Sequence, residues 1–257
     1  MQVEIRKEKK FKYVDEGEGD VLLLLHGLFG AMSNFKDLIE EFRHRYRIVL
    51  PLLPLFELPF TRANLPGLVK HIQKFVEHKQ LDSFSLIGNS LGGHIALMYA
   101  LEHLDPVRSI ILTGSSGLYE HSLGDTFPKR GSYEYVKEKT ELTFYDPKVA
   151  SKELVDEVFS IVNDRRKALN VIATAKSAIR NNLRELLPKI TVPVLLIWGK
   201  NDRITPAFVG EEFQKCLPNA TLKFIDKCGH APMMERPKEF NVLLDEFLQQ
   251  VLTPTES

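Results

Sequence analysis

One serine stands in a sequence pattern that is typical of a catalytic nucleophile. Ser90 is the central residue of Gly88-Asn89-Ser90-Leu91-Gly92, which matches Gly-x-Ser-x-Gly. An apolar run at residues 84–87 predicts a buried strand before the pattern, and one at residues 95–101 predicts a helix after it. A serine on such a sharp strand-to-helix turn has strained backbone geometry and presents its hydroxyl above the sheet edge. The pattern also occurs in ordinary strand–loop–helix joints, so its meaning depends on what else reaches that edge.

A serine hydroxyl is a weak nucleophile and needs a base that a third group orients. Two later residues are candidates: Asp202 follows the predicted strand at 192–198, and His230 follows the predicted strand at 221–225. Alone, Asp202 would fit an ordinary turn, and any one of the eight histidines is more often structural. Together they follow strand ends at one edge of a parallel sheet, in the chain order Ser, Asp, His. We therefore predict a Ser90–His230–Asp202 triad.

Backbone N–H groups near Ser90 could stabilise a developing oxyanion. Leu91 begins the helix after the serine, so its N–H has no partner within the helix. The second donor is expected in the loop after the strand Val21–Leu25, from Leu28 or, as the alternative, from Phe29. A phosphate-binding loop is the other interpretation, but neither Gly-x-Gly-x-x-Gly nor a Walker pattern occurs there. The sequence therefore gives no support to a nucleotide cofactor.

Strands and helices alternate over most of the chain. This predicts an α/β fold with a mostly parallel central sheet flanked by helices. Between about residues 118 and 189 only helical periodicity occurs, which predicts a helical cap or lid inserted into the fold. We therefore expect a core domain at 1–116, a cap at 117–189 and the rest of the core at 190–257. Ser33 and Asn34 are expected to cap a helix. The predicted strands are 3–5, 11–14, 21–25, 46–50, 84–87, 107–112, 192–198 and 221–225.

Composition narrows the range of partners. The 257 residues contain 34 Lys and Arg and 34 Asp and Glu, a balance that argues against nucleic acid or an anionic membrane as partner. The charged N-terminus lacks the apolar core of a signal peptide, and no apolar run is long enough to span a membrane. The two cysteines have no metal-ligand or redox spacing. We expect a cytoplasmic monomer or homodimer that acts on a small molecule.

The chain resembles the α/β-hydrolase superfamily. The resemblance rests on His26-Gly27, the segment around Ser90, Trp198-Gly199-Lys200-Asn201-Asp202 and Gly229-His230, in this order, and it covers about residues 10 to 250. It implies a Ser90 nucleophile, a His230 base and an Asp202 that orients it, with a helical cap and with no metal or organic cofactor.

Two subfamilies remain open. Asn89 before the serine is similar to the corresponding position of meta-cleavage-product hydrolases, which break carbon–carbon bonds, and Arg165 and Arg166 could then meet a substrate carboxylate. A solvated helix face is an equally good interpretation of that arginine pair. The segment 231–234, Ala-Pro-Met-Met, is closer to general esterases, and residues 51–59 lack the Asp-x-Pro-Gly-x-Gly segment usual in the superfamily.

The function that we expect is hydrolysis of small, largely apolar carboxylic esters through an acyl-enzyme. A carbon–carbon bond hydrolase and a non-catalytic ligand-binding protein of the same fold are the alternatives. The pocket is expected to be apolar, with aromatic residues of the lid such as Phe127 and Phe159 nearby. The residues that we predict to bind substrate are Phe29, Leu118, Phe144 and Arg166.

Overall fold

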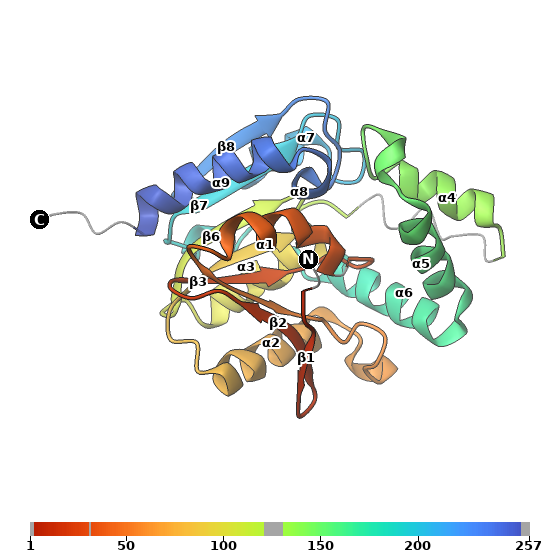
Figure 1. Cartoon of the computed structure of the whole chain (residues 1–257), viewed down its shortest axis with the longest axis horizontal. Coiled ribbons are helices and arrows are strands. Elements are labelled where there is room, and N and C mark those ends of the chain that lie inside the picture. The colour runs from red at the N-terminus through yellow and green to blue at the C-terminus, as the bar shows by residue number, and fades with distance from the viewer. Residues whose placement is uncertain (1–2, 31, 121–130, 253–257) are drawn as a thin grey trace, which may run out of the picture.

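The computed structural model describes residues 3–30, 32–120 and 131–252. Their strands form one eight-stranded sheet in the order β1-β2-β4-β3-β5-β6-β7-β8 (Figure 1). β1 and β2 are antiparallel to their neighbours, and every pairing from β4 to β8 is parallel. The mostly parallel α/β sheet predicted from the sequence is thus confirmed. The strands are β1 (Arg6–Glu8), β2 (Phe11–Glu16), β3 (Val21–Leu25), β4 (Arg47–Pro51), β5 (Phe84–Asn89), β6 (Val107–Thr113), β7 (Val194–Gly199) and β8 (Ala220–Ile225).

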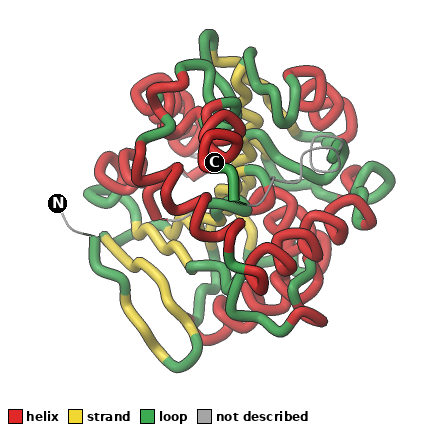
Figure 2. Tube along the Cα trace, turned by 90° about the vertical axis from the view of Figure 1, so that its right-hand side faces the viewer, coloured by secondary structure: helices red, strands yellow, loops and turns green. Residues whose placement is uncertain are grey.

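Both faces of the sheet are buried under helices, as Figure 2 shows from the side. Successive side chains of a strand point to opposite faces. In β3, Leu23 and Leu25 therefore join one apolar cluster, and Leu22 and Leu24 join the other. The first cluster contains residues of α2 (Leu65–Lys79), α3 (Leu91–Glu102) and α7 (Ala207–Cys216). The second contains residues of α1 (Lys36–Phe42), α8 (Pro232–Glu235) and α9 (Pro237–Leu252).

A helical segment separates β6 from β7 and lies at one side of the sheet (Figure 1). It contains α4 (Tyr133–Glu141), α5 (Lys152–Asn163) and α6 (Arg165–Arg180). Ser132, Ser151 and Asp164 cap these helices, since each side chain accepts a hydrogen bond from a backbone N–H of the first turn. Within the described part of the segment no strand occurs.

The first strand and the start of α1 differ from the expectation. The predicted strand at 3–5 is wrong, because pairing with β2 begins at Arg6. The alternation of apolar and charged residues at 3–5 is therefore not a sign of sheet pairing. Ser33 and Asn34 do not cap α1: a 3-10 turn covers Met32–Phe35, and Phe35 precedes the helix without a side-chain cap.

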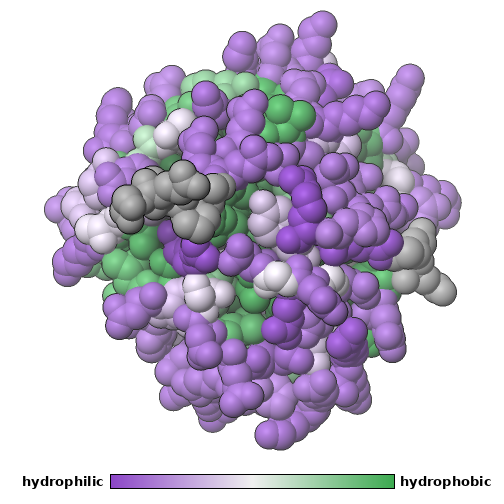
Figure 3. Space-filling model, turned by 60° about the vertical axis from the view of Figure 1, so that its left-hand side comes forward, coloured by the Kyte–Doolittle hydropathy of each residue, from purple (hydrophilic) through white to green (hydrophobic). Residues whose placement is uncertain are grey.

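On the face drawn in Figure 3 the surface is mainly hydrophilic, with hydrophobic side chains between charged and polar ones. Of the helices that the structure describes, none is long and apolar enough to cross a bilayer.

Candidate active site

Ser90 occupies the turn between β5 and α3 with a strained backbone. Its φ of 53° and ψ of −118° lie outside the regions that a non-glycine residue normally adopts. The Ser90 N–H donates to the carbonyl of Thr113 at 3.0 Å, and the Ser90 carbonyl accepts from the N–H of Gly93 and of Ser116. The turn is tight because a Cβ at Gly92 would lie 1.9 Å from the Leu25 carbonyl oxygen. These contacts hold the serine in its unfavourable conformation.

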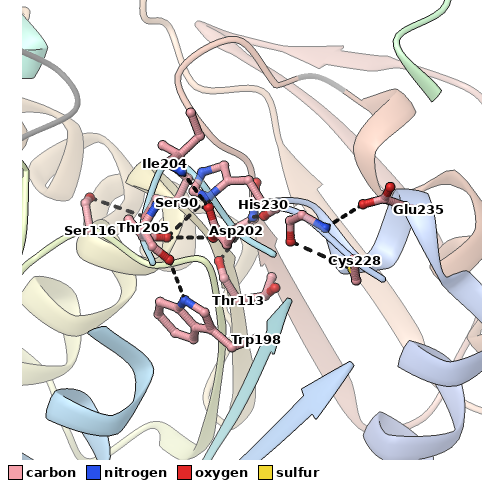
Figure 4. A network of polar contacts seen from close by, with 12 residues as sticks. Ser90, Thr113, Ser116, Trp198, Asp202, Ile204, Thr205, Cys228, His230 and Glu235 are labelled. Carbon is pink, nitrogen blue, oxygen red and sulfur yellow. Dashed lines mark hydrogen bonds and ion pairs between the residues drawn. The ribbon is translucent and has the colours of Figure 1, made fainter. Parts of the chain in front are cut away.

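The side chains of Asp202 and His230 are buried and lie within ion-pair distance of each other, next to Ser90 (Figure 4). His230 Nδ1 lies 2.9 Å from Asp202 Oδ2, so the ring donates from Nδ1 and keeps Nε2 as an acceptor. Asp202 Oδ1 also accepts from the N–H groups of Ile204 and Thr205 at 2.8 and 2.9 Å. The Thr205 hydroxyl donates to Asp202 Oδ2 at 2.9 Å. The carboxylate is therefore fixed by its own turn and aimed at the imidazole.

His230 reaches this position because the chain beside it leaves room for the ring. Gly114 follows β6 with a φ of +51°, and a Cβ there would lie 2.7 Å from His230 Nδ1. The Asn89 amide donates to the His230 carbonyl at 3.2 Å, and the His230 N–H donates to the Thr143 carbonyl at 2.8 Å. The end of β5 and the helical segment thus both hold the histidine loop.

The loop before His230 is anchored by a buried carboxyl. Glu235 in α8 accepts hydrogen bonds from the N–H groups of Gly229 and Asp146, each at 2.6 Å. Cys228 is fully buried there, and burial raises the pKa of its thiol. The thiol therefore stays protonated and unreactive near neutral pH.

A cavity of about 30 Å³ lies beside Ser90. Leu28 and Leu91, the two predicted oxyanion donors, both line it together with the serine. Leu91 is the first residue of α3, so its N–H has no acceptor within that helix. The other lining residues are Ser116, Tyr119, Glu120, Thr174, Ala175, Ala178, Ile204 and Thr205.

Two further buried histidines support the loops around the cavity. His26 Nδ1 donates to the Gly27 carbonyl at 2.8 Å, and His26 Nε2 accepts from the Leu53 N–H at 2.9 Å. His94 Nε2 donates to the Asn181 carbonyl at 2.8 Å, which joins α3 to the end of α6. Burial lowers the pKa of each ring to about 4, so both are neutral near pH 7 and serve as structural links.

None of the four predicted substrate-binding residues is among the described residues that line this cavity. Phe29 packs near Val136, Val158 and Val162, and Phe144 is buried in the apolar cluster that contains α9. Leu118 packs against the cluster on the other face of the sheet. Arg166 lines a separate surface groove and donates to the Glu57 carbonyl at 3.2 Å. Phe127 lies outside the described residues.

Several residues of the site were not found from the sequence. Thr205 could have been found from the sequence, because an Asp side chain in a turn often accepts hydrogen bonds from backbone N–H groups a few residues later. Gly114 had only its place after a predicted strand. Tyr119, Glu120 and Ala175 gave no local signal, because the fold alone brings them to Ser90.

Comparison with known proteins places the chain in a family. Residues 22–242 match the model of the family described as "Alpha/beta hydrolase family". The chain belongs to the alpha/beta hydrolase family. This confirms the fold predicted from the sequence, and the family and the named relatives identify the protein as a hydrolase.

The proteins that are similar to this α/β-hydrolase are named as different kinds of hydrolase. A 2-hydroxy-6-oxononadienedioate/2-hydroxy-6-oxononatrienedioate hydrolase of Pseudomonas sp is 29% identical, over 91% of this chain and 90% of the relative. The monoacylglycerol lipase ABHD6 of Bos taurus is also 29% identical, over 91% of this chain and 77% of the relative. Among solved structures, the metagenomic α/β-hydrolase MGS-MChE2 is 39% identical, with a TM-score of 0.80 over 96% of this chain and 98% of its own. A membrane phospholipase A is 25% identical, with a TM-score of 0.84 over 95% and 84%.

Proposed function

We propose that this protein is a serine hydrolase that cleaves small, largely apolar carboxylic esters through an acyl-enzyme. The observation that carries the proposal is the 2.9 Å contact between His230 and Asp202 beside a strained Ser90. In the first half-reaction Ser90 Oγ attacks the ester carbonyl and His230 Nε2 takes the hydroxyl proton. The imidazolium then gives that proton to the departing alcohol. In the second half-reaction water, deprotonated by His230, hydrolyses the acyl-enzyme, which releases the carboxylic acid and restores Ser90.

Asp202 has an electrostatic and an orienting role in this scheme. It accepts the Nδ1 proton of His230 in a hydrogen bond and stabilises the imidazolium without taking the proton. The N–H groups of Leu91 and Leu28, which line the cavity, would bind the oxyanion of the tetrahedral intermediate. One such donor contributes roughly 3 kcal/mol to transition-state stabilisation in other enzymes.

Small substrates are favoured by the dimensions of the cavity. The cavity is narrow, with a volume of about 30 Å³. Part of its wall is formed by α6, which belongs to the helical segment. We propose that this segment, residues 117–189, acts as a lid. Because three of the lining residues are alanine or threonine on α6, we expect short to medium acyl chains to fit best.

Covalent labelling with a fluorophosphonate tests the proposal. An activated serine attacks the phosphorus, whereas an unactivated hydroxyl does not. We expect the wild-type protein to be labelled and Ser90→Ala to be unlabelled, with folding of both checked by circular dichroism. A folded wild-type protein that resists the label would favour the non-catalytic alternative.

A second candidate reaction is hydrolysis of a carbon–carbon bond, and the Pseudomonas relative is named as a hydrolase of 2-hydroxy-6-oxononadienedioate. Asn89 before the serine is the feature of this chain that favours it. High activity on a dienoic keto acid together with little activity on p-nitrophenyl esters would select this candidate over ester hydrolysis.

A further inference from the structure

The cavity beside Ser90 contains a carboxyl group for which the proposed mechanism has no use. Glu120 lines the cavity together with Ser90, Leu28 and Leu91, and the residue is only 9% exposed. A carboxyl group is seldom buried without a partner, because removal from water disfavours its charge. Its position at the reacting serine therefore calls for a chemical explanation.

The chain after β6 fixes this carboxyl in place. The Ser116 N–H donates to the Ser90 carbonyl at 3.2 Å, which attaches the loop to the nucleophile turn. Gly117 has a φ of +124°, and its N–H donates to Glu120 Oε1 at 2.5 Å. Burial raises the pKa of Glu120, and the Gly117 hydrogen bond opposes this shift only in part. The carboxyl is thus held by the backbone of its own loop, and the residue forms part of the cavity wall.

The described wall of the cavity offers Glu120 no permanently charged cation. Its lining residues there include no lysine, arginine or histidine. Arg165 and Arg166 line the separate groove with Glu57 and Phe60 instead. When Glu120 is ionised, its negative charge acts on a substrate group beside the scissile ester, at a buried position where solvent screens it less than at the surface.

We propose that Glu120 is a specificity-determining residue of this site, which excludes esters with a negative charge near the scissile bond and favours neutral or cationic ones. The inference rests on the proposed ester hydrolysis. It narrows the substrate class, because a dicarboxylate such as the dienedioate in the Pseudomonas relative's name would meet Glu120 with a like charge. A group that donates a hydrogen bond, such as an alcohol hydroxyl, would instead find an acceptor.

Three acetate esters of similar size with permanent charges test this inference. They are acetylcholine, which is cationic, 3,3-dimethylbutyl acetate, which is neutral, and 2-sulfoethyl acetate, which is anionic. The measured quantity is the ratio of kcat/KM between two esters at pH 8, since any general loss of activity cancels in a ratio. Wild type is expected to hydrolyse the anionic ester most slowly, and Glu120→Gln is expected to raise the anionic-to-neutral ratio about tenfold or more. Glu120→Gln should also lower the cationic-to-neutral ratio.

Glu185→Gln is the matched control, because it removes the same charge from an exposed position on the helical segment. Its ratios should equal those of wild type. Glu120→Asp retracts the carboxyl by one methylene and should give intermediate ratios, which keeps the test valid if the Gln variant fails to fold. Equal ratios in wild type and the Glu120 variants would overturn the inference while ester hydrolysis stands. If wild type hydrolyses none of the esters and resists the fluorophosphonate, the proposed function fails and the inference fails with it.

Discussion

The two hollows of this molecule differ in chemistry and in size. The cavity beside Ser90 has about 30 Å³ and a wall of small apolar and hydroxyl-bearing residues with one carboxyl. The groove between residues 57–60 and α6 has about 460 Å³ and contains Arg165 and Arg166. Phe60 and Leu169 of the groove are 60% and 44% exposed. The larger, more charged hollow is thus the one that does not include Ser90.

Both hollows share one helix, and this explains the difference. On α6, Thr174, Ala175 and Ala178 line the Ser90 cavity, whereas Arg165, Arg166 and Leu169 line the groove. The two sides and the two ends of a helix present different residues. Two residues of the same helix therefore need not lie at the same site. We propose that catalysis takes place in the small hollow, and each of the following experiments tests that proposal.

The largest effect is expected at the carboxylate behind the small cavity. Asp202→Asn keeps the size of the side chain but removes the charge that holds His230 in its Nδ1–H form. We expect kcat for p-nitrophenyl acetate to fall roughly 10³- to 10⁴-fold, the scale known for such a substitution in other triads. Asp226→Asn changes an exposed aspartate at the end of β8 and serves as the control. A comparable loss in both variants would mean that His230 is not the base.

A smaller loss is expected from displacing the imidazole. In Gly114→Ala the new methyl group would lie 2.7 Å from His230 Nδ1 and 2.8 Å from the His230 carbonyl, so the ring or its loop must shift. A misplacement of about 1 Å can cost about 100-fold in rate, and we expect a loss of this order in kcat/KM. Gly131→Ala is the matched control, because Gly131 also has a positive φ, +87°, but a Cβ there meets nothing within 4 Å.

The two glycine variants distinguish the effect of backbone strain from that of a steric clash with His230. Both should lose about 1 kcal/mol of stability because alanine disfavours a positive φ, and Gly114→Ala should lose more because its methyl group collides with His230. Only Gly114→Ala should lose activity when both are assayed well below their melting temperatures. Equal activity in the two folded variants would show that the gap beside His230 has no role in catalysis.

The sequence predicted the parts of this site that depend on strand ends. Ser90, Asp202 and His230 each follow a parallel strand, and parallel strands bring their carboxyl ends to one edge whatever the intervening chain does. The wall of the cavity depends instead on how α6 is rotated and on the loop after β6. Arg166 was predicted to meet a substrate carboxylate from its charge and its place in the helical segment, whereas Ala178 and Glu120 were overlooked. Side-chain chemistry makes an arginine conspicuous in a sequence, whereas an alanine attracts notice only once its neighbours are known.

The smallest effects are expected from substitutions on the two sides of α6. These substitutions test directly whether the substrate binds in the Ser90 cavity or in the groove. Ala175→Val adds two methyl groups to the wall of the small cavity, so it should reduce the space for an acyl chain. In a series of p-nitrophenyl esters we expect wild type to prefer short to medium chains. In the variant, kcat/KM for butyrate should fall about tenfold, the usual scale for one or two methylenes in a pocket, with a smaller fall for acetate. Arg166→Ala removes a hydrogen bond to the Glu57 carbonyl at the groove and should change every ester by less than about twofold, as for other exposed side chains. A larger effect of Arg166→Ala than of Ala175→Val would reverse the assignment and make the groove part of the substrate site.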